Sequence, residues 1–140
     1  MSVAAASVTF ITPNVSIVRD FYDRYFDTWY PFDCGWYVLI RLGRTPAAPE
    51  VGFMEPQQGA DSFCGGSMLN LVVDDVDAMH QRMSEADEKI VIPLTDNPWG
   101  DRGFGVADPA GVVVYCHEAI PPSGEFRQFI QKSPAAQRGA

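Results

Sequence analysis

Two stretches of sequence decide the fold: residues 7–22, SVTFITPNVSIVRDFY, and residues 68–83, MLNLVVDDVDAMHQRM. Each stretch opens with a short run rich in apolar and β-branched residues, which predicts a strand. After a polar capping residue, Asn14 or Asp75, apolar side chains recur at steps of three and four, which predicts an amphipathic helix. The two capping residues are 61 positions apart, so the two stretches indicate copies of one unit.

The same offset of 61 residues also aligns residues 51–54 with residues 112–115. The first unit has predicted strands at 7–12, 28–32, 36–42 and 51–55 and a helix at 15–27. The second has predicted strands at 68–73, 89–94, 104–107 and 112–117, a helix at 76–86 and a turn-rich stretch at 95–103. We therefore predict an α+β protein with two tandem βαβββ modules, at about 7–56 and 68–118, within one domain of residues 1–120. Residues 121–140 are expected to form a partly disordered C-terminal extension, with a short helix at 125–131 and a frayed end from 133.

The charge of the chain narrows the classes of partner. It carries 10 Lys and Arg against 18 Asp and Glu, a formal net charge of −8, which argues against binding to nucleic acid or to an anionic membrane surface. The N-terminus lacks a basic segment followed by a long apolar run, so we expect no secretory signal and a cytoplasmic location. Cys34, Cys64 and Cys116 lack CxxC spacing and are expected to be idle thiols.

Local motifs add a family resemblance. The run TPNV at 12–15, followed by RDFY at 19–22, is similar to the opening of modules in the vicinal oxygen chelate superfamily. The run PWGDR at 98–102, then Phe104 and DPAG at 108–111, resembles a later motif of the same superfamily, which includes glyoxalase I, bleomycin-resistance proteins and extradiol dioxygenases. The resemblance implies a curved, barrel-like open sheet around a central cavity, with helices outside. It also implies a homodimer, since such members commonly build their crevices from two chains.

Metal-dependent members of that superfamily place one ligand on the first and last strand of each module. The resemblance carries these positions to Ser7, Met54, Met68 and Tyr115. None is a usual ligand for Zn²⁺, Mg²⁺ or Ni²⁺, so we expect no metal and no cofactor. A one-residue slip that brings in Glu55 and Cys116 would turn apolar rows into the cavity and is disfavoured. A displaced metal site that uses His117 is the other alternative.

Strand alternation predicts which side chains face the cavity, because successive residues point to opposite faces of a sheet. Val8, Phe10, Val112, Val114 and Cys116 are expected under the helices. The opposite faces of the strands carry the residues that we expect to line the cavity. Two tryptophans, Trp36 and Trp99, are suited to stacking on a planar ligand. Together they form the predicted ligand set: Thr9, Trp36, Met54, Met68, Asn70, Trp99, Tyr115 and His117.

Three functions remain open from sequence. The favoured one resembles the bleomycin-resistance branch: a metal-independent protein that binds a planar cationic or neutral small molecule, such as an antibiotic, without catalysis. The alternative is a glyoxalase-like lyase or isomerase, or a dioxygenase-type enzyme, with a degenerate or displaced metal site. The third is an accessory domain that binds a partner protein. No activated nucleophile is apparent, so the sequence favours binding, and no catalytic residue is predicted.

Overall fold

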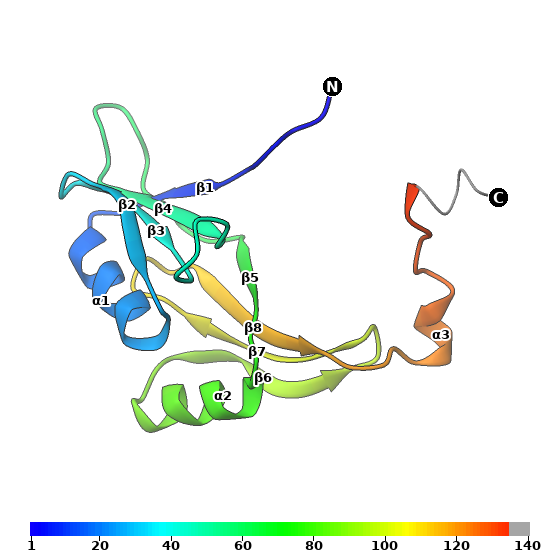
Figure 1. Cartoon of the computed structure of the whole chain (residues 1–140). Coiled ribbons are helices and arrows are strands. Elements are labelled where there is room, and N and C mark those ends of the chain that lie inside the picture. The colour runs from blue at the N-terminus through cyan, green and yellow to red at the C-terminus, as the bar shows by residue number, and fades with distance from the viewer. Residues whose placement is uncertain (135–140) are drawn as a thin grey trace. The chain divides into compact units, whose positions relative to one another are not determined.

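The structure, a computed structural model, describes residues 1–134, and its elements follow one another along the chain as labelled in Figure 1. The first half contains β1 (Val8–Ile11), α1 (Val15–Tyr25), β2 (Trp29–Asp33), β3 (Tyr37–Arg41) and β4 (Glu50–Met54). The second half contains β5 (Met68–Val72), α2 (Val76–Glu85), β6 (Ile90–Asn97), β7 (Asp101–Ala107), β8 (Val113–Ala119) and the short α3 (Gly124–Arg127). The end that was predicted to fray lies mostly outside the described residues, at 135–140.

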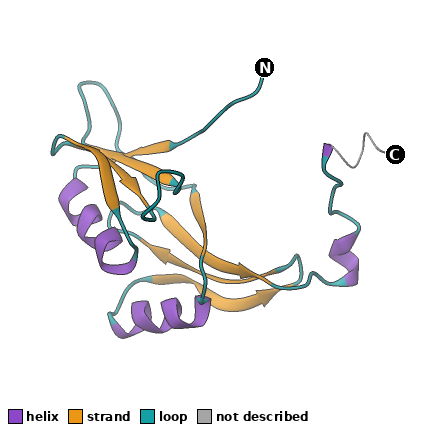
Figure 2. Ribbon diagram, viewed as in Figure 1, coloured by secondary structure: helices purple, strands orange, loops and turns teal. Residues whose placement is uncertain are grey.

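Each half forms an open four-stranded sheet, with the order β1-β4-β3-β2 in the first and β5-β8-β7-β6 in the second. Figure 2 draws these strands in orange and the helices in purple. In the first sheet β1 runs parallel to β4 and β4 runs antiparallel to β3. The identical strand order and the helix after the first strand confirm the predicted α+β fold of two tandem βαβββ modules. The helices begin at Val15 and Val76, as the 61-residue offset predicts.

The two helix starts differ in their capping. The side chain of Asp75 accepts a hydrogen bond from the Ala78 backbone N–H at 3.0 Å, as predicted. Asn14 was expected to cap in the same way, but its side chain makes no capping hydrogen bond. Instead, the Asn14 backbone N–H donates to the Thr12 hydroxyl at 3.2 Å, so the residue before the proline orders the start of α1.

By its internal contacts the chain divides into two compact units, residues 1–69 with 107–114 and residues 70–106 with the chain from 115 onward. Strands β5 and β8 therefore contribute to both units. Each unit is described by itself below. No helix within residues 1–134 is both long and apolar enough to cross a membrane.

The core of the first unit lies between α1 and one face of its sheet. The apolar stripe of α1 is buried, and the ring of Tyr22 lies 5.4 Å from the ring of Phe53 on β4. Residues of β1, β3 and β4 at alternate positions complete this core: Phe10, Val38, Ile40, Val51 and Phe53. Val8 was expected in the same row, but that prediction is wrong, because Val8 starts an edge strand and its side chain is 55% exposed.

The helix-side faces of the second module follow the predicted alternation. Val114 and Cys116 on β8, and Val112 just before it, are fully buried. Burial raises the pKa of the Cys116 thiol to about 12, so this thiol is a packing group and not a nucleophile. On α2, the half-buried ring of His80 meets the buried ring of Phe104 edge to face at 5.0 Å, which gives this histidine a packing role.

The β6–β7 hairpin corrects the prediction of a turn-rich stretch at 95–103. Strand β6 continues to Asn97 and strand β7 begins at Asp101, and these two residues pair directly across the hairpin. Only three residues make the connection, and Gly100 provides the positive φ of +120° that such a tight turn requires. The physical reason is that ladder pairing extended both strands into residues with modest strand propensity.

Candidate ligand site on the second sheet

The open face of the second sheet carries a cluster of polar and aromatic side chains around Asp101. Asp101 Oδ1 accepts hydrogen bonds from the Tyr115 hydroxyl at 2.7 Å and from Asn97 Nδ2 at 2.8 Å. Asp101 Oδ2 accepts one from the indole nitrogen of Trp99 at 3.0 Å. Asn97 Nδ2 also donates to the Tyr115 hydroxyl at 2.9 Å. The chain thus gathers three donors on one carboxylate, and we name Asn97, Trp99, Asp101, Tyr115 and His117 the Asp101 cluster.

The Asp101 carboxylate remains charged and keeps room for another partner. Burial tends to raise its pKa, but the hydrogen bonds from Asn97, Tyr115 and Trp99 outweigh burial and hold the pKa below its usual range. An ionised carboxylate can accept about four hydrogen bonds, and three are made here. The remaining acceptor position is on Oδ2, next to the Trp99 ring, so an N–H or cationic group could be received there.

Tyr115 and His117 occupy alternate positions of β8, and their rings stack at 5.3 Å with an angle of 30° between them. Burial, followed by the hydrogen bond to Asp101, raises the pKa of Tyr115 to about 12, so its hydroxyl stays protonated and donates. The neighbouring strand β7 leaves space for these rings because it carries a glycine, Gly103, opposite them. A Cβ on Gly103 would lie 2.6 Å from the ring and hydroxyl of Tyr115 and 2.8 Å from the Cβ of His117.

Trp99 gives the cluster an accessible flat surface. Its side chain is 55% exposed in the β6–β7 turn, whereas Tyr115 is buried and His117 is half-buried. A large ring beside a fixed negative charge suits a planar ligand with a positive edge, because stacking and ion pairing would act at the same place.

Three of the eight predicted ligand residues, Trp99, Tyr115 and His117, come together in this cluster. The other two members were missed as site residues. Asn97 and Asp101 were missed because they fall in the stretch predicted as turns. Side chains alternate between the two faces of a strand, so the buried Phe104 shows that Asp101, three residues earlier, lies on the opposite face, the same face as Tyr115. Asn70 also belongs to this unit, on β5 with an exposed side chain.

The remaining predicted residues lie in the first unit. Thr9 and Met54 share the open face of the first sheet, where the Thr9 hydroxyl lies 3.4 Å from the hydroxyl of Tyr37. Trp36 is 46% exposed, and its ring lies 6.2 Å from the ring of Tyr37. Met68 opens β5 with a 49% exposed side chain. Thr9, Met54 and Tyr37, which was not predicted, lie on this second, more apolar surface.

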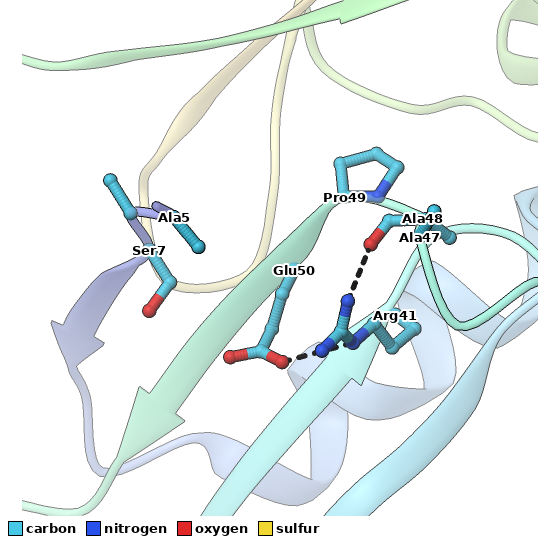
Figure 3. Close-up of a pocket in the computed structure, with 8 residues that line it drawn as sticks. Ala5, Ser7, Arg41, Ala47, Ala48, Pro49 and Glu50 are labelled. Carbon is cyan, nitrogen blue, oxygen red and sulfur yellow. Dashed lines mark hydrogen bonds and ion pairs between the residues drawn. The ribbon is translucent and has the colours of Figure 1, made fainter. Parts of the chain in front are cut away.

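The first unit carries a pair of hollows formed by described residues. One has a volume of about 340 Å³, and in it the guanidinium of Arg41 pairs with Glu50 at 3.0 Å and donates to the Ala48 carbonyl at 2.9 Å. Figure 3 shows these side chains around the hollow. These contacts neutralise Arg41, so this hollow does not favour an anion. The other, of about 280 Å³, includes Thr9 beside the 61–65 loop. Neither hollow contains an activated catalytic group.

The positions implied for a metal do not fit one. Ser7, Met54, Met68 and Tyr115 supply two hydroxyls and two thioethers, and the Tyr115 hydroxyl already donates to Asp101. Metals of this class require imidazole, carboxylate or thiolate donors. Within residues 1–134, no three His, Cys, Asp or Glu side chains come together in a way that could hold a metal ion.

Known proteins are similar to this chain in sequence and in fold. Mb0911c, an uncharacterized protein from Mycobacterium bovis, is 30% identical in an alignment that covers 76% of this chain and 78% of that protein. A superfamily member from Sphaerobacter thermophilus has a similar structure, with a TM-score of 0.68 and 22% identity over 84% of this chain and 98% of that one. Lactoylglutathione lyase from Agrobacterium tumefaciens has a TM-score of 0.66 and 20% identity over 84% and 96% of the two chains. At these identities the two structures establish the fold alone.

A family profile matches the sequence of this chain from the first module into the last strand of the second. The profile of the Glyoxalase/Bleomycin resistance protein/Dioxygenase superfamily matches residues 7–115, from just before β1 into β8. This range includes the first βαβββ module, the second as far as the first residues of β8, and four of the five residues of the Asp101 cluster. The chain therefore belongs to the Glyoxalase/Bleomycin resistance protein/Dioxygenase superfamily.

Proposed function

We propose that this protein binds a small planar molecule, cationic or neutral, without a metal ion and without changing the molecule chemically. The observation that carries the proposal is the Asp101 carboxylate, held by three donors, beside the 55% exposed ring of Trp99. A fixed anion next to a flat ring complements a heteroaromatic cation. An antibiotic of that chemistry is one such ligand.

The chemistry of the side chains supports binding over catalysis. A tyrosine with a pKa of about 12 is a poor general base at neutral pH, and Tyr115 is engaged as a donor to Asp101. The Cys116 thiol is buried on the opposite face of β8 and its pKa is raised. The Asp101 carboxylate has a lowered pKa, which makes it a good ion-pair partner and a weak base.

The first test compares three ligands of similar shape and different charge: proflavine, acridine and acridine-9-carboxylate. Tryptophan fluorescence titration at pH 7.4 is expected to rank proflavine above acridine and acridine above the carboxylate, with proflavine affinity falling as salt rises. Removing the ring in Trp99→Ala should weaken proflavine binding by about 1–3 kcal/mol, roughly 5- to 150-fold. Trp99→Phe, which keeps a ring, should lose less.

Asp101→Asn separates the charge from the shape of the site. The amide should abolish the preference for proflavine over acridine, because it keeps a polar group and removes the anion. The matched variant Trp36→Ala changes an exposed tryptophan of the first unit, and is expected to leave proflavine affinity unaltered. If Trp36→Ala removes binding and Trp99→Ala does not, the ligand binds the first sheet, and the assignment to the Asp101 cluster fails.

The proflavine titration also tests metal independence, and mass spectrometry of the ligand tests the absence of turnover. Proflavine affinity should not change when EDTA is added or when Zn²⁺, Ni²⁺ or Mn²⁺ is supplied. Mass spectrometry after prolonged incubation should return the ligand unaltered. Affinity weaker than millimolar for every planar compound, a metal requirement, or a converted ligand would each overturn the proposed function. The last two would favour an enzyme of the glyoxalase or dioxygenase kind.

We also propose a homodimer in the cytoplasm. The open face of the first sheet carries half-buried Tyr37, Leu39 and Met54, and the edge strand β5 exposes Val72, so these surfaces remain to be covered. Sedimentation equilibrium at micromolar concentration should give twice the chain mass of 15.4 kDa. A mass near that of one chain would contradict it. The exposed free thiols of Cys34 and Cys64 support a reducing compartment, which fractionation of the native cells would check.

A further inference from the structure

The segment that follows β8 is attached to the β6–β7 turn by its backbone. The Ile120 N–H donates to the Gly100 carbonyl at 3.0 Å, and the Ser123 N–H donates to the Pro98 carbonyl at 2.8 Å. These bonds satisfy the two carbonyls that flank Trp99. Figure 1 shows the result, with α3 close to the tip of the β6–β7 hairpin.

Gly100 permits this close approach. Its φ of +120° suits glycine, and a Cβ there would lie 3.3 Å from the Ile120 carbonyl oxygen and 3.4 Å from the Cβ of Pro122. A side chain at position 100 would therefore both strain the turn and press on the segment. The turn and the segment after β8 are fitted to each other.

The segment also reaches the Trp99 ring itself. Phe126 on α3 meets this ring edge to face, with 6.3 Å between the ring centres. On its polar side the same indole donates to Asp101 Oδ2 at 3.0 Å. Trp99 is thus held between a ring from the C-terminal segment and the carboxylate of the candidate ligand site, while much of its surface remains exposed.

We propose that residues 120–127 form a clamp that fixes the Trp99 indole on Asp101, with Phe126 as the positioning residue. A fixed ring loses less conformational entropy when a ligand stacks on it, so the clamp raises affinity for a planar ligand. Only this consequence for affinity rests on the proposed function; the holding of Trp99 does not. The C-terminal extension thereby becomes a part of the ligand site.

The test in the full chain uses the indole N–H resonances in ¹H–¹⁵N spectra, assigned with single Trp→Phe variants. In Phe126→Ala we expect the Trp99 indole resonance to shift toward that of a solvated indole, and its exchange with solvent to accelerate. Ile130→Ala is the matched control, because Ile130 is 64% exposed and lies outside the clamp, and it should leave the resonance in place. The Trp29 and Trp36 resonances should not move in either variant.

The ligand arm measures proflavine affinity in the same two variants. Phe126→Ala should weaken binding about three- to ten-fold, the range expected for one aromatic contact, and Ile130→Ala should not. An unmoved Trp99 resonance in Phe126→Ala overturns the clamp, whatever proflavine does. A moved resonance with unchanged proflavine affinity overturns its role in binding. If proflavine and acridine fail to bind even the unmodified chain, the proposed function fails, and the resonance alone decides whether the clamp exists.

Discussion

Replacing Asp108 by alanine is expected to destabilise the first unit by about 2–4 kcal/mol, because the change removes three hydrogen bonds at once, two of them buried. Asp108 Oδ2 accepts from the hydroxyl of Tyr22 at 2.7 Å, and both residues are buried. Asp108 Oδ1 accepts from the backbone N–H groups of Ala110 at 2.8 Å and Val112 at 3.0 Å, which closes the turn before β8. Urea unfolding, followed by circular dichroism, measures the loss.

Asp108→Asn is the matched control. Its amide oxygen can accept from the same two backbone groups, and its Nδ2 can donate to the Tyr22 hydroxyl oxygen, so the loss should stay below about 1 kcal/mol at pH 7. Tyr22→Phe removes one donor alone and should cost about 1–2 kcal/mol. An Asp108→Ala variant that is as stable as the unmodified chain would show that the turn does not need its carboxylate.

The stability difference between the unmodified chain and Asp108→Asn should depend on pH, and its direction follows from the pKa of Asp108. Burial raises the pKa of Asp108, although the hydrogen bonds from Tyr22 and the backbone act in the opposite direction. A group whose pKa is higher in the folded than in the unfolded chain stabilises the fold most below the unfolded pKa, about 3.9. Relative to Asp108→Asn, the unmodified chain should therefore lose stability as the pH rises from about 4 through the folded pKa. A relative gain over that window would contradict the assigned shift.

Substitution of Gly103 by alanine is expected to impair both the stability of the second unit and its ligand binding. The added Cβ would meet the Tyr115 ring and hydroxyl at 2.6 Å and the Cβ of His117 at 2.8 Å. Tyr115 cannot move aside without breaking its hydrogen bonds to Asp101 and Asn97. We expect a stability loss of about 1–3 kcal/mol and a loss of proflavine affinity of at least about ten-fold.

Gly124→Ala provides the comparison for this experiment, because a Cβ at Gly124 meets no atom within 4 Å and the backbone there does not require glycine. It should not change stability appreciably; because Gly124 lies within the clamp of residues 120–127, the affinity control remains Ile130→Ala, outside the clamp. Tyr115→Phe in addition to Gly103→Ala is informative, since removing the hydroxyl relieves part of the clash and should recover part of the lost stability. If Gly103→Ala alone binds proflavine as tightly as the unmodified chain, the ligand does not use the Asp101 cluster.

The architecture was largely predictable because its determinants are local or periodic. The offset of 61 residues placed the starts of α1 and α2, and strand alternation placed Val112, Val114 and Cys116 in the core. Alternation failed at Val8, where the strand is an edge and α1 does not cover its first residue. Burial at such a position depends on the neighbouring elements and not on the local pattern.

The sequence by itself determined the two modules, because hydrophobic periodicity and turn residues act over a few neighbouring positions, and its local motifs carried the resemblance to the family. Tertiary structure alone decided the site. The Asp101 cluster depends on the pairing of Asn97 with Asp101 and on the position of Tyr115, 14 residues further along the chain, on another strand of the sheet. Tyr22 and Asp108, 86 residues apart, meet only when the chain is folded. Such contacts arise from register and packing between distant segments, which no local pattern encodes.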